Sequence, residues 1–228
     1  MELLQADQVS FSYVNRFQRV DAVKNVSCRF ETGKAYAIVG KSGSGKTTLL
    51  SLLGGLENPT EGDVLYEGTP LRNMDRDAYR RDVAAVIYQS LNLFPLLTAV
   101  ENVMYPLILR GAAVNEARAR AETALRSVGM QADQFKRLPS RLSGGEQQRV
   151  AIARAVCADN RIILADEPTG NLDITNGDQV VSILLRLAHE QDRCVIVVTH
   201  DLEIADQMDE VLMMKDGRME QEQPEELV

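Results

Sequence analysis

Cysteine is scarce in this chain of 228 residues, and its placement argues against a fold held together by disulfides. The three cysteines (Cys28, Cys157 and Cys194) are far apart in the sequence and lie in apolar surroundings. Small disulfide-stabilised domains carry several cysteines at close spacing, usually in even number. We therefore expect three buried free thiols in a protein of the reducing cytoplasm.

Long hydrophobic runs are missing as well. No apolar stretch approaches the roughly 18 residues that a membrane-spanning helix needs. Residues 1–7 contain no basic segment that leads into an apolar core, so we expect no secretory signal. We see neither an internal repeat nor a low-complexity linker. Any connection to a membrane is therefore expected to run through a partner protein.

Positive charge is in deficit, with 25 Lys and Arg against 33 Asp and Glu and a formal net charge of −8. A general nucleic-acid binder needs a basic face that neutralises phosphates. The balance therefore argues against nucleic acid as a partner, although it leaves room for a local basic patch. The hydrophobic share of 45% and the charged share of 25% are ordinary for a globular protein.

The most informative stretch present is residues 40–48, GKSGSGKTT, which contain the pattern G-x-x-x-x-G-K-[ST]. A strand-like apolar run (35–39) precedes it, and a buried helix-like segment (48–53) follows. Glycines let successive backbone N–H groups converge on one point, where the helix N-terminus adds partial positive charge. In this pattern Lys46 reaches the terminal phosphates and Thr47 ligates Mg²⁺. We expect a site for ATP and Mg²⁺ formed by Gly40, Lys41, Ser42, Gly43, Ser44, Gly45, Lys46, Thr47 and Thr48.

The hydrophobic pattern predicts an α/β fold. Residues 7–31 alternate apolar and polar side chains, which is typical of antiparallel strands with one solvated face. Several short apolar runs indicate further strands, and buried strands that alternate with helices form mainly parallel sheets. Such runs lie at 64–66, 83–88, 162–165, 194–198 and 211–214, the last followed by a hairpin turn. Helical spacing covers 99–109, 115–128, 143–158 and 179–190.

Together these patterns predict one P-loop NTPase domain over residues 1–228. It would have a mainly parallel core sheet, an N-terminal antiparallel β subdomain and an inserted α-helical subdomain. Residues 1–89 and 159–228 are assigned to the core with its antiparallel sheet, and residues 90–158 to the helical subdomain.

Polar side chains end three of the predicted strands, where ligands of open parallel sheets gather. Asp166 follows a buried strand and is placed to complete a Mg²⁺ site with Thr47, unless it only caps a helix. Glu167 is placed to polarise an attacking water as general base, the alternative being a surface salt bridge. His200 is expected to contact the γ-phosphate and that water rather than to be a satisfied loop histidine. Gln89 is expected to ligate Mg²⁺ or the water, the alternative being an ordinary loop amide.

A further motif, LSGGEQQR at 142–149, resembles the signature motif of ATP-binding-cassette (ABC) ATPases. The phosphate loop, Gln89, the strand ending at Glu167, Asp173 and His200 stand in the order of that family. The resemblance spans nearly the whole chain.

The resemblance implies that two such domains stack head to tail with ATP between them. The signature residues of one copy would then close over the ATP of the other, as a second anion site at a helix N-terminus. These residues are Ser143, Gly144, Gly145 and Glu146. Asp173 would contact the partner across the seam. Tyr13 would stack on adenine, with Phe11 and Phe17 as competing aromatics.

Within the family, ADEPTGNLD at 165–173 and LENPTEG at 56–62 resemble macrolide exporters, lipoprotein-release complexes and antimicrobial-peptide transporters. Amino-acid importer subunits usually carry Ser-Ala in place of Gly170 and Asn171. Residues 93–95 and 97–103 recur in both groups and do not discriminate between them.

The resemblance implies an ATPase subunit, peripheral on the inner face of the cell membrane, that powers a separate permease. The family receives its permease at the segment Ser90–Tyr105, whose apolar residues are also suited to the core of the helical subdomain. A second ATPase subunit, as an identical copy, is the other expected partner. Three alternatives remain open: a cell-division ATPase without transport, an amino-acid or ion importer subunit, and a binding module with a degenerate site.

Overall fold

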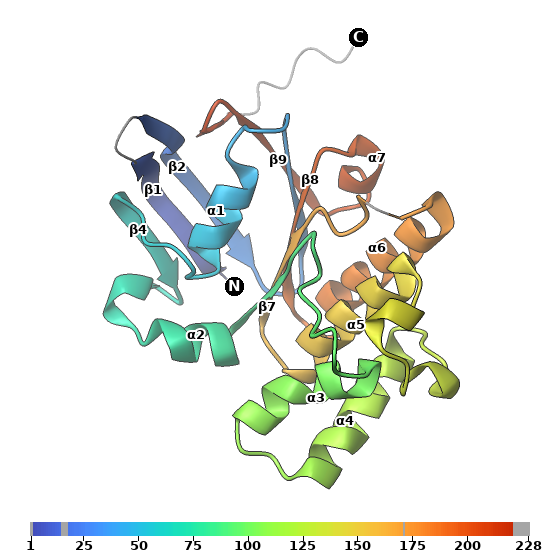
Figure 1. Ribbon diagram of the computed structural model, residues 1–228. Helices are drawn as coiled ribbons and strands as arrows, with labels where there is room; N and C mark the ends of the chain where they lie inside the picture. The colour runs from blue at the N-terminus through green and yellow to red at the C-terminus, as the bar shows by residue number, and fades with distance from the viewer. Residues whose placement is uncertain (1, 15–17, 171, 221–228) are drawn as a thin grey trace.

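The protein consists of two β-sheets with helices packed around them (Figure 1). The structure is a computed structural model that describes residues 2–14, 18–170 and 172–220. The α/β class, the parallel core sheet and the N-terminal antiparallel sheet predicted from the sequence are all confirmed.

The core sheet has six strands in the order β10-β9-β3-β8-β7-β6, all parallel except the edge strand β10. Its central strands are buried throughout and apolar except at their carboxyl ends, where β7 ends in Asp166 and β8 in Thr199, as expected for a parallel sheet covered on both faces. The strands are β3 (Ala35–Val39), β6 (Ala84–Ile87), β7 (Ile162–Asp166), β8 (Cys194–Thr199), β9 (Glu210–Lys215) and β10 (Arg218–Met219).

The second sheet is antiparallel, in the order β2-β1-β4-β5. Strands β1 (Glu2–Val14) and β2 (Arg19–Glu31) form a long pair, and β4 (Glu61–Tyr66) and β5 (Thr69–Pro70) complete it. Alternate residues of β1 and β2 are buried, which accounts for the period-two pattern of the sequence.

The two faces of the core sheet bury different sets of residues. Ile38, Leu164 and Ile196 pack with helix α1 (Lys46–Leu53) and the antiparallel sheet. Figure 1 shows α1 lying between the two sheets. The neighbouring residues, such as Ala37 and Val197, point to the opposite face and join the core of the helices beyond it.

Helices α3 (Ala99–Leu109), α4 (Val114–Ser127) and α5 (Gly144–Cys157) pack on one another at one end of the core sheet (Figure 1). Their bounds agree with the predicted helices to within one or two residues. Helix α6 (Ile174–His189) begins earlier than the predicted Gln179, because its first turn is polar and carries no apolar periodicity. The sequence pattern also missed two short helices, the polar α2 (Arg76–Asp82) and the four-residue α7 (Leu202–Ala205), each capped by an aspartate.

The cysteines are buried and free, as predicted. Among the described residues, no helix is both long and apolar enough to cross a membrane.

Candidate functional site

The phosphate-binding pattern forms a tight loop between β3 and α1. Gly45 has φ +103°, and a Cβ at this position would lie 2.2 Å from the carbonyl oxygen of Ala22. A Cβ at Gly40 would lie 2.1 Å from the carbonyl oxygen of Met214. Both glycines are therefore required for the close packing of this loop against β2 and β9.

The buried Lys46 side chain curls back over the loop. Its ammonium donates hydrogen bonds to the carbonyl oxygens of Gly40 (2.7 Å) and Lys41 (3.1 Å). These are neutral partners, so the positive charge of Lys46 remains available to an anion bound in the loop. Ser44 is also buried, and among the described residues its hydroxyl has no hydrogen-bond partner.

A cavity of about 950 Å³ lies in front of this loop. It is the place where the structure brings together most of the residues singled out in the sequence. The residues that were predicted from the sequence and that line this cavity are Tyr13, Lys41, Ser42, Gly43, Gly45, Lys46, Thr47, Thr48, Gln89, Glu167 and His200.

Tyr13 is the aromatic residue that reaches this cavity. It is 50% exposed, and its hydroxyl lies 3.3 Å from Thr48 Oγ1. Phe11 is buried in the core of the antiparallel sheet and meets Tyr13 edge to face. Phe17 and Asn171 lie outside the described residues. Tyr13, rather than Phe11, is therefore the residue whose ring is exposed at the cavity.

Thr47 and Asp166 meet at the end of β7. The Thr47 hydroxyl donates a hydrogen bond of 3.1 Å to Asp166 Oδ1. Burial raises the pKa of Asp166, while the bond from Thr47 opposes that rise. A hydroxyl and a carboxylate are hard oxygen donors, and Mg²⁺ in nucleotide sites needs only one or two of them besides phosphates and water. The pair therefore fits Mg²⁺. Thr47 and the exposed Gln89 line the 950 Å³ cavity, whereas Asp166 is not one of its lining residues.

Glu167 and His200 form a pair across the ends of β7 and β8. Glu167 Oε1 lies 2.9 Å from His200 Nδ1, and Glu167 Oε2 accepts a bond of 3.4 Å from the Thr199 hydroxyl. The Glu167 backbone has φ +47°, a conformation uncommon outside glycine, and its N–H donates to Val198 O at 2.8 Å. The chain turns sharply at this point and directs the carboxylate toward the cavity. A carboxylate held in this way can accept a proton from a water molecule in front of it.

The LSGGE segment lies elsewhere. Ser143 caps α5: its hydroxyl accepts from the Glu146 N–H (3.3 Å), and Glu146 Oε2 accepts from the Ser143 N–H (2.6 Å). Of the contacts that lower the pKa of Glu146, the hydrogen bond from the Ser143 backbone N–H has the largest effect. Ser143 and Gly144 are exposed, and none of the four residues from Ser143 to Glu146 lines the 950 Å³ cavity.

Asp173 caps α6 next to this segment. Its carboxylate accepts from the backbone N–H (2.9 Å) and the side-chain amide (2.8 Å) of Asn176, and the backbone contact is the leading cause of its lowered pKa. A Cβ at Gly145 would lie 2.7 Å from Asn176 Oδ1, which also accepts from Arg149 at 3.2 Å. Asn176 therefore joins Asp173 to the start of α5. The sequence reasoning did not identify it, although an Asn three residues after a capping Asp is a usable signal.

The sequence reasoning also missed one wall of the cavity. Strand β2 contributes Ala22 and Lys24, and the β9–β10 turn contributes Asp216 and Gly217. The Gly217 N–H donates to Ser44 O (2.9 Å), and the Lys24 N–H donates to Gly217 O (2.7 Å). Neither segment carries a phosphate-binding pattern, so only the three-dimensional packing places them here.

Comparisons with known proteins agree on one family. The family model described as "ABC transporter" matches residues 23–170. The uncharacterized ABC transporter ATP-binding protein YclH of Bacillus subtilis is 43% identical over 205 residues, which is 90% of each chain.

Solved structures show the same likeness. The dimeric structure of MJ0796, described as a bacterial ABC transporter cassette, matches with a TM-score of 0.90 at 38% identity, over 96% of this chain and 97% of that one. The same cassette, as a dimer bound to ADP and Pi after hydrolysis, matches with a TM-score of 0.89 at 39% identity and the same coverage. CbiO1 from Clostridium perfringens, part of the ABC transporter complex cbiONQ, matches with a TM-score of 0.85 at 25% identity, over 96% of this chain and 87% of that one.

Proposed function

The chain belongs to the ABC transporter ATPase family, and from this premise we propose that it hydrolyses ATP to drive a separate membrane permease of the exporter or lipoprotein-release type. The observation that carries the proposal is the convergence of the phosphate loop, Gln89 and the Glu167–His200 pair on one cavity. Asp166 joins them through its hydrogen bond with Thr47, which lines that cavity. The two pairs supply, in one place, hard donors for a metal and a base for water.

We propose the following roles in hydrolysis. Lys46 and the N–H groups of residues 40–48 bind the phosphates of ATP, and the ring of Tyr13 stacks on the adenine. Thr47, Asp166 and Gln89 would hold Mg²⁺, which would supply positive charge beside the phosphates. Glu167 takes the proton from the attacking water, and His200 holds the Glu167 carboxylate in place while contacting the γ-phosphate.

A second copy of the chain completes the site in this proposal. The N-terminus of α5, with the exposed Ser143 at its cap, would supply a second anion site, and its residues do not line the chain's own 950 Å³ cavity. Two similar cassette structures are described as dimers. We propose that Ser143, Gly144, Gly145 and Glu146 close over the ATP of the partner, and that Asp173 contacts the partner at the seam.

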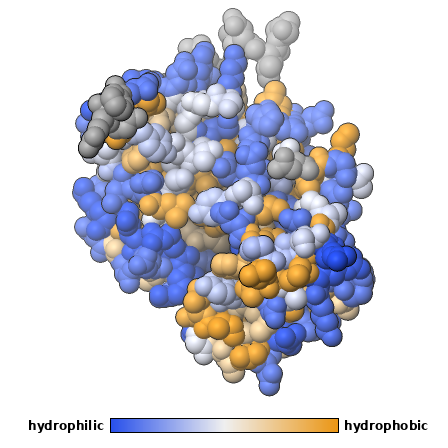
Figure 2. Space-filling model, viewed as in Figure 1, coloured by the Kyte–Doolittle hydropathy of each residue, from blue (hydrophilic) through white to orange (hydrophobic). Residues whose placement is uncertain are grey.

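The permease would dock on the helical subdomain, residues 90–158 in the proposed division of the chain. Figure 2 shows apolar side chains gathered over α3. Phe94, Leu96, Tyr105, Ile108 and Leu109 are exposed there, and the rings of Phe94 and Tyr105 lie 4.6 Å apart. An exposed apolar surface of this kind is typical of a site for a protein partner. Docking would hold the ATPase on the inner face of the membrane.

The assignment to the exporter and lipoprotein-release group rests on residues 165–173 and 56–62. Affinity capture of the tagged protein from detergent-solubilised membranes, followed by identification of the copurified chains, tests the proposal. We expect a permease with a large extracellular domain and ATP turnover by the purified complex. Capture of septal proteins alone, or a requirement for a substrate-binding receptor, would contradict it.

A further inference from the structure

A groove of about 340 Å³ lies where the helical subdomain meets the core sheet, beside the exposed apolar surface of α3. Its walls combine apolar side chains with three basic ones, one acidic one (Asp77) and the amide of Asn160. The apolar ones come from β6, α3 and α5: Ala85, Val86, Tyr105, Pro106, Leu109, Ala151 and Ala155. The basic ones are Arg80, Arg81 and Arg154.

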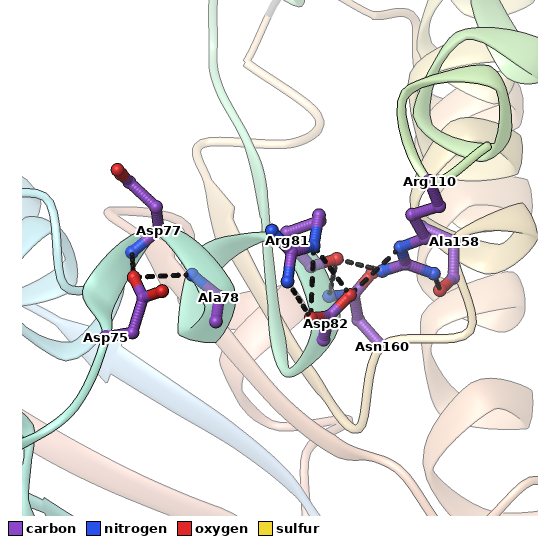
Figure 3. A network of polar contacts seen from close by, with 8 residues as sticks. All are labelled: Asp75, Asp77, Ala78, Arg81, Asp82, Arg110, Ala158 and Asn160. Carbon is purple, nitrogen blue, oxygen red and sulfur yellow. Dashed lines mark hydrogen bonds and ion pairs between the residues drawn. The ribbon is translucent and has the colours of Figure 1, made fainter.

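Most arginines at this groove already have a carboxylate partner. Arg80 pairs with Asp77, and Arg81 pairs with Asp82 at 2.7 Å. Arg110, beside the groove, pairs with the same Asp82 at 3.1 Å, so that two guanidinium groups share one carboxylate (Figure 3).

Arg154 is the exception. Among the described residues, no carboxylate lies within ion-pair distance of its guanidinium. Its two terminal nitrogens instead donate to the carbonyl oxygens of Asn92 and Leu91, each at 2.9 Å. Burial lowers the pKa of Arg154, yet a guanidinium keeps its proton at any physiological pH. A half-buried charge bound only to neutral acceptors leaves a place for an anion.

The two carbonyls that Arg154 holds belong to a strained turn. Leu91 has φ +59° and Asn92 has φ +45°, and consecutive residues other than glycine in this region are unfavourable. The turn immediately follows Gln89 and Ser90. Gln89 lines the 950 Å³ cavity, while Arg154 lines the groove. The guanidinium therefore connects the groove to a side chain in the nucleotide cavity through two hydrogen bonds.

We propose that the permease segment that docks in this groove presents a carboxylate to Arg154, and that this contact competes with the Leu91 and Asn92 carbonyls and thereby repositions Gln89. This inference rests on the proposed function. A carboxylate forms a charge-assisted bidentate pair with a guanidinium, roughly twice as strong as hydrogen bonds to neutral carbonyls. Loss of the two backbone bonds leaves the left-handed turn without its restraint. The occupant is thus an amphipathic segment with an apolar face and one acidic side chain.

The first test uses the isolated chain. Hydrogen exchange is followed at the amides of Leu91 and Asn92, which donate to Tyr88 O (2.9 Å) and Ser90 O (2.7 Å). We expect Arg154→Gln to speed exchange at these amides by about tenfold. Arg154→Lys should have a smaller effect than Arg154→Gln, because the Lys ammonium is still a charged donor, although it replaces the two terminal nitrogens of the guanidinium. Arg72, which pairs with Asp63 on the antiparallel sheet, provides the control variant Arg72→Gln. Unchanged exchange at the turn in a folded Arg154→Gln protein would overturn the positioning role.

The second test uses the copurified complex. Each Asp or Glu in the cytoplasmic segments of the permease is replaced by Asn or Gln, with and without Arg154→Gln. We expect one permease variant to lower the ATP turnover of the complex about tenfold, as Arg154→Gln does, and the double variant to lose little more. The alternative outcome is that, in an assembled complex, the fold-losses of ATP turnover caused by Arg154→Gln and by each permease variant multiply in every double variant. That outcome would refute the carboxylate contact and leave the proposed function standing. Absence of any permease from the wild-type preparation contradicts the proposed function itself.

Discussion

Replacing Glu167 by Gln removes a base while leaving the shape of the site unchanged. The amide has the size of the carboxylate and keeps one acceptor oxygen for Thr199 or His200, which lie 3.4 Å and 2.9 Å from the carboxylate oxygens. It cannot take a proton from water at neutral pH. The substitution therefore separates proton transfer from nucleotide binding.

The size of the effect follows from this geometry. General base catalysis contributes about 100- to 10,000-fold to rates, which corresponds to about 3–5 kcal/mol of activation free energy. Stability should change by no more than about 1 kcal/mol, because the backbone conformation and the size of the side chain are retained. We therefore expect ATP turnover to fall by about two to four orders of magnitude in a protein that melts close to the wild-type temperature.

The assay combines phosphate release with size-exclusion chromatography under saturating ATP and Mg²⁺. Because ATP persists in the variant, an ATP-bound dimer should accumulate, whereas the wild type returns to monomer as it consumes ATP. The exposed Glu116 on α4 provides the matched control Glu116→Gln, which should behave as wild type. A Glu167→Gln protein that hydrolyses ATP within a factor of about ten of wild type would refute the assignment of the base. Persistence as a monomer at saturating ATP would refute the nucleotide-held dimer.

Three other predictions concern the loop, the seam and the thiols. Gly45→Ala should abolish ATP binding in a fluorescent-nucleotide titration, because its Cβ would lie 2.2 Å from Ala22 O at φ +103°. Mixing Lys46→Ala and Ser143→Ala proteins one to one should restore about a quarter of wild-type turnover, because head-to-tail pairing leaves one intact site in each mixed dimer; no restoration means that each site is built from one chain. Burial raises the pKa of the thiols to about 12, 11 and 12 in Cys28, Cys157 and Cys194, so iodoacetamide at pH 8 should label them only after unfolding. Since these folded pKa values lie above the unfolded ones, their contribution to stability is intact below about pH 9 and should decline as the pH rises toward 12, by about 1.4 kcal/mol per pH unit and thiol at most.

The part of the site that the sequence predicts well is local or follows from the parallel sheet. The loop at 40–48 is contiguous, and its strand and helix flanks were visible as apolar runs. Gln89, Glu167 and His200 follow three parallel strands, and such strand ends meet at one edge. Their convergence on one cavity was therefore predictable without knowledge of the helices.

The part that escaped prediction depends on contacts between distant segments. Arg154 meets Leu91 and Asn92 only because α5 packs behind the Gln89 turn. The β9–β10 turn reaches the phosphate loop through a backbone bond that any residue type could make. Asp173 was expected from the motif order, but the hydrophobic pattern did not place the start of α6 there, because its apolar periodicity begins only several residues into the helix. Patterns of hydrophobicity carry no information on contacts of these kinds.

Helix α5 joins the two ends of the proposed mechanism. Ser143 caps its N-terminus at the proposed seam with the partner's nucleotide, and Arg154 lies about three turns further along, in the groove. The helix is packed against α3, α4 and α6, and its buried face includes Val150, Ile152 and Ala153, so a close-packed element joins the two residues. In the proposed mechanism, a permease carboxylate that binds Arg154 would act on Gln89 through the released turn and on Ser143 along the axis of the helix. ATP binding at the seam would then act back on the groove through the same helix, because coupling between two binding sites is reciprocal.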